Sequence, residues 1–436
     1  MLKKLARKLV SSKKYRLSSF TTHLIPYTLH LQPYTSLSFH LITVPLLLHF
    51  KTTTLAGIYI HIPFCKQACN YCNFHFSTSL RYKQPLIEAI VQELQFPASL
   101  VEQQEPIETI YFGGGTPSLC SEAELNSMLA AIYKNYTVAP DAEITFETNP
   151  DDISVPQLDM WQRSGINRLS IGVQSFFEED LLWMNRAHNA TQAITGLELA
   201  LSRFNNITMD LIYGTPGLTH EKWQQNVAKA VGLGIPHLSC YALTVEPQTP
   251  LDKQIRQHQK NNVDPGFQSE QFLLLMQWAK EAGYEHYEIS NFAKPGYRSK
   301  HNSSYWQGKN YWGYGPSAHS FNGSSRWWNI ANNTKYIQAI TQNQAAFEIE
   351  TLTPVQQVNE FIMIALRTME GLPLTVIKEK WPLLMAEGNE INPADNILTA
   401  AQHHIQQGHM VHQNNHLQLT NEGKLLADGI TADLFV

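Results

Sequence analysis

Three of the five cysteines in this chain lie in one short stretch that directly follows an apolar segment. Cys65, Cys69 and Cys72 follow residues 59–64, Y-I-H-I-P-F, at the spacing C-x3-C-x2-C. A loop with this spacing can place three thiolates at three corners of a cubic iron–sulfur cluster, because soft thiolates are the ligands that such clusters take. The fourth iron would have no protein ligand, and an open coordination position is where a small molecule can bind and react.

Two other uses of these cysteines are weaker. A structural zinc site needs four ligands, and His61 or His75 could supply the fourth, but no second Cys/His pair follows at the spacing of a zinc finger. A disulfide framework does not suit a long chain with an odd number of cysteines, whose other two, Cys120 and Cys240, lie in unrelated segments. Those two are expected to be ordinary small buried residues.

The cysteine loop resembles the signature of the radical S-adenosylmethionine (radical SAM) enzymes, in which an aromatic residue, here Tyr71, precedes the last cysteine. The segment Y-I-H-I-P-F-C at 59–65 resembles the branch that contains oxygen-independent coproporphyrinogen III oxidases and HemW-type haem chaperones, and the resemblance extends over residues 57–436. It implies a 4Fe-4S cluster held by the three cysteines, with S-adenosyl-L-methionine bound to the open iron. Tyr59 and Tyr71 would line the pocket for that cofactor.

A run of glycines follows the next predicted strand. Gly113, Gly114 and Gly115 would let the backbone turn tightly and expose its amides to a polar ligand, and Thr116 adds a hydroxyl group. An ordinary turn would explain the run equally well. The resemblance implies that Gly114, Gly115 and Thr116 bind the methionyl end of the cofactor.

Four further polar residues fall at or just after the ends of successive predicted strands. They are Glu147, Gln174, Arg186 and Asp210. Each alone is more readily explained as solvated or structural, but a barrel gathers the carboxyl ends of its strands on one face, where the cysteine loop also lies. The resemblance implies that all four contact S-adenosyl-L-methionine.

A second stretch, residues 299–320, is rich in aromatic residues and glycine and contains two histidines. Its composition suits the binding of a flat ligand, whereas the alternative is a buried aromatic cluster whose histidines are satisfied by hydrogen bonds. The sequence H-N-x-x-Y-W at 301–306 resembles a motif of HemW-type chaperones, which implies that His301 ligates haem iron. Imidazole is a usual axial ligand of haem, and His319 is the alternative ligand in the same stretch.

The elements that must position these residues follow the pattern of an α/β protein. Short apolar runs alternate with amphipathic segments of helix length, which predicts a parallel sheet in a partial or full (β/α) barrel of the radical SAM type. The predicted strands are 57–62, 107–112, 143–148, 168–173, 206–212, 236–241 and 284–289. The predicted helices are 80–96, 121–135, 155–164, 190–203 and 219–233, and then 268–282. The polar segment 246–268, punctuated by proline, is expected to be an exposed excursion.

The chain is longer than one ordinary core requires, and we expect three parts. Residues 1–56 form a basic extension, and residues 57–345 form the barrel including the H-N-x-x-Y-W segment. Residues 353–436 form a small, mainly helical, winged-helix-like domain, with helices at 355–368, 372–384 and 394–408 and a hairpin at 410–420. This domain would pack on the barrel.

Charge is distributed unevenly along the chain. Residues 1–56 carry eight lysines and arginines and no acid, so 24 basic residues face 37 acidic ones in the remainder, which argues against nucleic-acid binding. A basic, acid-free extension is typical of an organelle transit peptide, and a signal peptide fits poorly. We favour a mis-assigned start, because no Met occurs between Met1 and Met128 and Leu55 nearly adjoins the first strand. We therefore expect a cytoplasmic protein, with organelle import as the alternative.

Two functions from different classes compete. One is an oxidase that decarboxylates the propionates of coproporphyrinogen III, and the other is a chaperone that binds haem and delivers it to haemoproteins such as respiratory cytochromes. The cysteine pattern of the oxidase branch is C-x3-C-x2-C-x-C, with a fourth cysteine two residues after the third. This chain resembles it up to Cys72 but has Phe74 at the position of the fourth cysteine. Phe74 and the H-N-x-x-Y-W segment favour the chaperone, so we expect a radical SAM protein without coproporphyrinogen oxidase activity. An electron donor for the cluster, and transient membrane contact during haem delivery, are further expected partners.

Overall fold

The computed structural model describes residues 56–96, 101, 105–386 and 388–436. These residues all fall within one unit, Thr53–Val436. Apart from Ala56, the predicted extension 1–56 lies outside the described residues, and the predicted division between barrel and C-terminal domain stays a prediction. None of the helices in the described ranges is long and apolar enough to cross a membrane.

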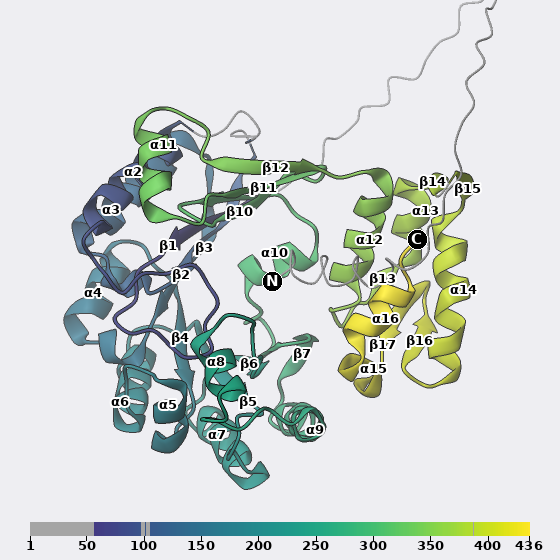
Figure 1. The fold of residues 1–436 in the computed structure, drawn as a ribbon, viewed down its shortest axis with the longest axis horizontal. Helices are drawn as coiled ribbons and strands as arrows, with labels where there is room; N and C mark the ends of the chain where they lie inside the picture. The colour runs from purple at the N-terminus through teal and green to yellow at the C-terminus, as the bar shows by residue number, and fades with distance from the viewer. Residues whose placement is uncertain (1–55, 97–100, 102–104, 387) are drawn as a thin grey trace, which may run out of the picture. The chain divides into compact units, whose positions relative to one another are not determined.

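A curved, twelve-stranded sheet forms the frame of the barrel (Figure 1). Its first six strands are parallel, and their bounds are β1 Ala56–Ile62, β2 Ile107–Gly114, β3 Val138–Thr148, β4 Arg168–Gln174, β5 Ile207–Tyr213 and β6 His237–Ala242. The strand order β12-β11-β10-β9-β1-β2-β3-β4-β5-β6-β8-β7 has two open ends in the described chain. The prediction of a (β/α) barrel is confirmed, and the barrel is partial.

Helices connect the parallel strands and cover the outer face of the sheet (Figure 1). They are α2 Lys83–Gln95, α3 Glu122–Asn135, α4 Val155–Arg163, α5 Glu178–Met184, α6 Ala190–Leu201 and α7 His220–Gly232, with short helices η1 Pro117–Leu119 and η2 Pro150–Asp152 at two strand ends. Capping boxes fix the N-terminal ends of two of these helices. Ser121 and Glu124 form the capping box of α3, and Asn189 and Gln192 form that of α6. Five of these helices match the predicted ranges to within a few residues, whereas nothing in the pattern predicts α5.

The two faces of the sheet differ because strand residues alternate between them. In β3, Ile144 and Phe146 point outward, and the ring centroid of Phe146 lies 5.4 Å from that of Trp161 in α4. Glu143 and Glu147 occupy alternate positions and face the inside of the barrel. The main hydrophobic core therefore lies between sheet and helices, and the inner face carries polar side chains.

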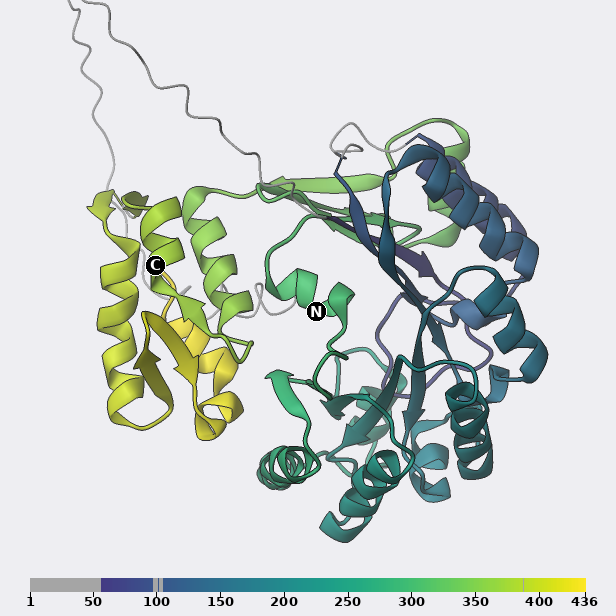
Figure 2. The ribbon, with the colours of Figure 1, turned by 180° about the vertical axis from the view of Figure 1, so that it is seen from behind.

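Residues 299–351 extend the sheet beyond β1, which the sequence pattern does not predict. The added strands are β9 Tyr311–Tyr314, which is parallel to β1, and then β10 His319–Phe321, β11 Ser325–Asn329 and β12 Phe347–Thr351, with helix α11 Asn333–Thr341 between the last two. Helix α10 Lys300–Trp306 precedes them and lies on the inner side of the sheet against β1 and β2 (Figure 1, Figure 2). The aromatic stretch is therefore part of the barrel frame.

The segment 246–268 agrees with its prediction except at one point. Most of its residues are exposed or half-buried, as expected, but helix α8 Pro250–Arg256 forms in its middle and Leu251 is fully buried. Leu251 packs with Ile212 and Leu243 in a small hydrophobic cluster. Pro250 occupies the first turn, where proline favours a helix instead of marking a loop. Helix α9 Pro265–Glu281 and strands β7 Glu285–Glu288 and β8 Asn291–Ala293 follow.

The C-terminal residues form helices around a small sheet. The elements are α12 Pro354–Ala365, β13 Leu372–Pro373, α13 Leu374–Lys380, β14 Leu384–Ala386, β15 Asn389–Ile391, α14 Pro393–Gln406, β16 Met410–Gln413, β17 His416–Leu419, α15 Asn421–Leu425 and α16 Ala427–Asp433. Three helices followed by the β16–β17 hairpin match the predicted winged-helix-like arrangement. Their buried residues form a hydrophobic cluster separate from that of the barrel.

Backbone contacts tie these C-terminal residues to the last strand of the large sheet. Glu288 and Thr368 form an antiparallel bridge, and the amide of Met369 donates to the carbonyl of Tyr287 at 3.0 Å. Residues 367–369 therefore run along the outer edge of β7.

Candidate functional site

The three clustered cysteines lie in the loop that follows β1, at the carboxyl end of the barrel strands, as predicted. Cys65, Cys69 and Cys72 are free and half-buried, whereas Cys120 and Cys240 are buried. Burial raises the pKa of Cys65, and it raises the pKa of Cys72 to about 11. Both thiols therefore stay protonated at neutral pH until a metal displaces the proton.

A single metal ion and an iron–sulfur cluster would use this loop differently. In the described ranges, no three side chains of His, Cys, Asp or Glu are placed to hold one metal ion. A cubic cluster makes a different demand, because each cysteine binds a separate iron and the thiols need not converge on one point. The zinc alternative gains nothing from His61, whose ring nitrogens are bonded to the Tyr59 hydroxyl at 3.1 Å and the His75 carbonyl at 2.9 Å.

Distant segments hold the cysteine loop through Asn70. The backbone amide of Asn70 donates to the carbonyl of Met184 at 3.1 Å, and its side-chain amide donates to the carbonyl of Trp183 at 3.1 Å. The carbonyl of Asn70 accepts the amide of Leu251 at 2.9 Å. The end of α5 and the start of α8 therefore fix the middle of the loop.

Asn185 holds the loop at a second point. It ends α5 in the left-handed conformation, with φ of 58°, which Asn tolerates better than most residues. Its side-chain nitrogen donates to the carbonyl of Ala68 at 2.7 Å, and its side-chain oxygen accepts from Nε2 of Gln67 at 3.0 Å. One residue thus binds two consecutive positions between the first two cysteines.

Arg186 connects the loop to the ends of β3 and β4. Its Nη1 donates to Sγ of Cys69 at 3.3 Å and to the hydroxyl of Tyr71 at 3.4 Å. Its Nη2 donates to Oδ1 of Asn149 and to the carbonyl of Gly172, both at 2.7 Å. Its buried Nε has no hydrogen-bond partner among the described residues, so one donor remains for a ligand. The structure therefore brings the predicted residues Tyr71 and Arg186 together beside the cysteines.

The glycine run packs against the start of the cysteine loop, and two of its amides are already used. The amide of Gly115 donates to the carbonyl of Ile62 at 2.8 Å, and that of Gly114 donates to Oε2 of Glu147 at 3.0 Å. A Cβ atom on Gly115 would lie 2.6 Å from the carbonyl oxygen of Phe64, so glycine is needed for this close approach. The prediction that these two amides are exposed to a ligand is wrong, because acceptors within the protein take them.

Two more predicted residues, Thr116 and Gln174, lie close to this part of the site. Nδ2 of Asn149 donates to the hydroxyl of Thr116 at 3.3 Å, and a hydrogen bond between Thr116 and Cys65 partly offsets the rise in the pKa of that thiol. Gln174 is the last residue of β4, and its side chain folds back over Gly172. Its side-chain nitrogen lies 3.1 Å from the place that a Cβ atom on Gly172 would occupy. Gln174 has φ of 71°, a strained conformation of the kind that is concentrated at functional sites.

Glu147 and Asp210 place two carboxylates inside the barrel. Oε1 of Glu147 accepts from the hydroxyl of Tyr111 at 2.7 Å, and Asp210 is hydrogen-bonded to the side chain of Ser239. Burial raises the pKa of Glu147 to about 7 and that of Asp210 to about 6, and the charge of Asp210 contributes to the rise at Glu147. No Lys or Arg of the described residues forms an ion pair with either one. Two such carboxylates fit a ligand with positive charge, such as the amino and sulfonium groups of S-adenosyl-L-methionine.

Tyr59 and His301 belong to an aromatic cluster inside the barrel. The ring centroid of Tyr111 lies 6.0 Å from that of Tyr59 and 4.9 Å from that of His301. His301 is 1% exposed, its Nδ1 is bonded to the hydroxyl of Thr109 at 2.7 Å, and its Nε2 is bonded to the hydroxyl of Tyr305 at 2.9 Å. Burial lowers the pKa of His301 to about 3, so the ring is neutral. Ligation of haem iron would require one of these bonds to break, and that role of His301 stays a prediction.

Two residues that hold α10 in place, Glu143 and Arg168, are not among those predicted from the sequence. Glu143 accepts the backbone amides of Lys300 and His301, both at 3.0 Å, at the start of the helix, where negative charge is favourable. Nε of Arg168 lies 3.7 Å from the carboxylate of Glu143. A signal for Glu143 exists, because it shares one face of β3 with Glu147, and the alternation of that strand marks the face as polar.

Comparisons with known proteins agree with this geometry. Residues 59–230 match the radical SAM superfamily. The chain is 30% identical over 383 residues to "Heme chaperone HemW" of Mycobacterium tuberculosis, which covers 87% of this chain and 94% of that protein. It is also 30% identical over 381 residues to "Heme chaperone HemW" of Bacillus subtilis, covering 86% and 98%. A solved structure of coproporphyrinogen III oxidase (HemN) from Escherichia coli, a radical SAM enzyme, has the same fold, with a TM-score of 0.75 at 23% identity over 88% of this chain and 90% of that one.

Proposed function

Since the chain belongs to the HemW family of radical SAM proteins, we propose that it is a haem chaperone, which binds a 4Fe-4S cluster, S-adenosyl-L-methionine and haem and delivers haem to haemoproteins. The observation that carries the proposal is the similarity to haem chaperones over nearly their whole length. Phe74 supports it, because this side chain, which is 64% exposed, stands where the oxidase pattern has a fourth cysteine.

Cys65, Cys69 and Cys72 would hold the cluster, since they share one loop that distant segments fix in place. The cluster and S-adenosyl-L-methionine supply one-electron chemistry when bound, and the protein orients them and excludes water. Glu147 and Asp210 would accept the positively charged groups of the cofactor. The remaining pocket residues in this proposal are Tyr59, Tyr71, Gly114, Gly115, Thr116, Gln174 and Arg186. Within the part of the chain that the structure describes, Nε of Arg186 is a buried donor without a partner.

The partners in this proposal are haem and the haemoproteins that receive it, such as respiratory cytochromes. An electron donor would reduce the cluster, and haem delivery would involve transient contact with a membrane. The protein would work in the cytoplasm. The excess of acidic residues outside 1–56 favours no nucleic-acid partner.

Anaerobic reconstitution followed by two assays on the same sample tests the function. We expect stable binding of haem and no conversion of coproporphyrinogen III to protoporphyrinogen IX. A variant with all three loop cysteines changed to Ala is the matched control, because it separates haem binding from cluster binding. Turnover of coproporphyrinogen III would support the oxidase, and the absence of haem binding would refute the chaperone.

A further inference from the structure

Strand β2 holds the carboxylate of Glu147 at both of its oxygens. The hydroxyl of Tyr111 donates to Oε1 at 2.7 Å, and the amide of Gly114 donates to Oε2 at 3.0 Å. An ionised carboxylate only accepts hydrogen bonds, so the phenol is the donor. Each oxygen can accept a further bond, and the two donors therefore fix the plane of the carboxylate while leaving it able to bind a ligand.

Aromatic neighbours fix the ring that carries this hydroxyl. The ring of Tyr111 is inclined by 29° to that of Tyr59 and by 27° to that of His301, and it is 9% exposed. Tyr59 belongs to β1 and His301 to α10, so two other elements hold the ring. The hydroxyl of Tyr111 is therefore in place before any ligand binds.

Gly113 lies between Tyr111 and Glu147 and has no side chain to separate them. A Cβ atom on Gly113 would lie 2.8 Å from Cε1 of Tyr111 and 2.9 Å from Oε1 of Glu147, which is closer than Cβ atoms approach other heavy atoms. The first glycine of the run 113–115 therefore allows the phenol to reach the carboxylate.

We propose that Tyr111 is a positioning residue of the S-adenosyl-L-methionine pocket, whose hydroxyl orients the carboxylate of Glu147 toward the positively charged groups of the cofactor. The inference rests on the proposed function and deepens it by adding a residue that the sequence pattern does not predict. The same bond favours the charged form of the carboxyl group. Burial raises the pKa of Glu147 to about 7, and the hydrogen bonds from Tyr111 and Gly114 oppose that rise.

The other ionisable groups around Glu147 keep one charge state between pH 7 and pH 8.5. Burial raises the pKa of the three tyrosines well above its usual value, whereas the pKa of Asp210 is about 6, so this carboxylate is charged throughout. Cys65 would bind iron in the reconstituted protein. These groups come from β1, β2, α10, β5 and the cysteine loop, and they are Tyr59, Tyr111, Tyr305, Asp210 and Cys65.

Calorimetric titration of the reconstituted full chain with S-adenosyl-L-methionine at pH 7 and pH 8.5 tests the inference. Tyr111→Phe keeps the ring and removes the hydroxyl, so the pKa of Glu147 should rise further. The affinity relative to wild type should fall about five- to fiftyfold at pH 7. At pH 8.5 it should return to within about fivefold of wild type, because the carboxyl group ionises again.

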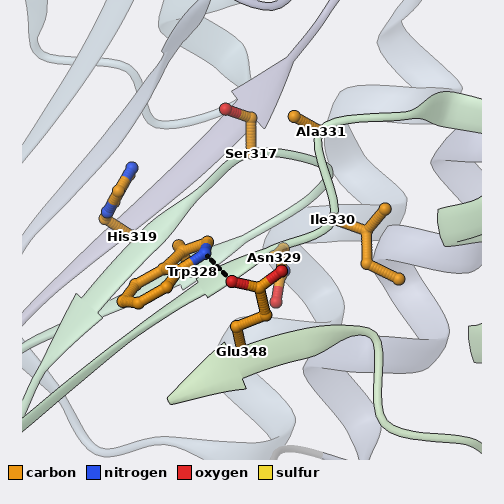
Figure 3. Close-up of a pocket in the computed structure, with 7 residues that line it drawn as sticks. All are labelled: Ser317, His319, Trp328, Asn329, Ile330, Ala331 and Glu348. Atoms are coloured by element: carbon orange, nitrogen blue, oxygen red, sulfur yellow. Dashed lines mark hydrogen bonds between the residues drawn. The ribbon is translucent and has the colours of Figure 1, made fainter. Parts of the chain in front are cut away.

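Tyr336→Phe is the matched control. It removes the same kind of hydrogen bond from Glu93, another buried carboxyl group whose pKa is raised to about 7. Glu93 also accepts from the side chain of Asn329 at 2.8 Å, and Asn329 lines a pocket of about 210 Å³ in the extension of the sheet, which Glu147 does not line (Figure 3). This variant should bind S-adenosyl-L-methionine as the wild type does at both pH values.

Gly113→Ala is a second test, because it pushes the phenol and the carboxylate apart while keeping the hydroxyl. It should reproduce the loss at pH 7, and it decides the matter if Tyr111→Phe does not fold. Wild-type affinity of Tyr111→Phe at pH 7, an equal loss at both pH values, or the same loss in Tyr336→Phe would overturn the inference while the proposed function stands. If the wild type binds no S-adenosyl-L-methionine, the proposed cofactor site and the inference fail together.

Discussion

Glu147 and Asp210 are buried carboxyl groups that form no ion pair with a lysine or arginine in the described ranges, although the charges of Arg186 and Arg168 partly offset the rise in the pKa of Asp210. The pKa of Glu147 is raised to about 7 by burial, so between its ordinary value of roughly 4.3 and 7 the folded state binds more protons than the unfolded state. Stability is therefore lost as the pH rises through that range, by on the order of 1–3 kcal/mol. A bound cation would reverse this loss, which is why such a pair marks a ligand site more strongly than a solvated carboxylate does.

The affinity for S-adenosyl-L-methionine should depend on the ionisation of Glu147. Between pH 5.5 and pH 7 we expect affinity to rise roughly tenfold, because the carboxylate that would bind the amino group becomes charged. Calorimetry on reconstituted protein measures this. Glu147→Gln should bind more weakly and lose the dependence, with its iron and sulfide content unchanged.

Asp210→Asn provides the matched control for this pH dependence. Removing the negative charge of Asp210 should lower the pKa of Glu147, so the rise in affinity should move to lower pH. A wild-type affinity that is constant from pH 5.5 to pH 7 would contradict the assignment of Glu147.

At the scale of elements, the parallel strands could be predicted because each is a short apolar run between helix signals. β9 to β12 could not, since short runs of aromatic residues and glycine around Tyr311 look like a ligand surface and β9 pairs with a strand far away in the chain. Helix α8 was missed because polar residues and proline surround Leu251, the side chain that anchors it.

Some residues of the candidate site could likewise be predicted from the sequence, and others could not. Cysteine spacing and strand ends identify Cys65 and Glu147, because local sequence determines both. Asn70 and Asn185 carry no local signal, since their value lies in hydrogen bonds to segments that only folding brings close. Asn70 and Asn185 therefore contribute to the site by holding the cysteine loop in place.

Asn185→Gly should weaken the hold on the cysteine loop while sparing the fold. Glycine adopts the left-handed conformation readily, so we expect the free energy of unfolding to change by less than about 1 kcal/mol. Without the bonds to Gln67 and Ala68, the loop thiols of the metal-free protein should react faster with iodoacetamide. The reconstituted protein should also hold less iron.

Asn414→Gly is the control for this variant. Asn414 also has a positive φ, 50°, but it lies in the turn of the β16–β17 hairpin. Equal thiol reactivity and equal iron content in the two variants would show that Asn185 does not position the loop.

At the scale of the whole molecule, two arginines join the barrel to the C-terminal helices. Arg367 is 9% exposed, donates to Oδ1 of Asp428 at 3.0 Å and lies 5.6 Å from the ring centroid of Trp306. Its charge also opposes the rise that burial causes in the pKa of Glu288. Arg298 is more exposed and forms its ion pairs at the surface.

Arg367→Ala should destabilise the protein much more than Arg298→Ala. The first change leaves Glu288 buried without a nearby positive charge, and we expect a loss of about 2–4 kcal/mol in the free energy of unfolding. The second removes surface ion pairs to Glu285 and Glu370, for which about 1 kcal/mol or less is usual. Urea unfolding of both variants measures the difference. Similar losses in the free energy of unfolding would mean that the burial of Arg367 adds nothing to its contribution to stability.

An unpaired sheet edge is a template on which another chain can add a strand. At the β12 end, Glu348 and Glu350 place negative charges along the strand, which discourages such pairing. At the other end, β7 is covered by residues 367–369, which are synthesised about 80 residues after it, or roughly 4–16 s later at usual rates. For that interval a ribosome-bound barrel carries an open strand, on which the barrel of a neighbouring nascent chain on the same mRNA can pair.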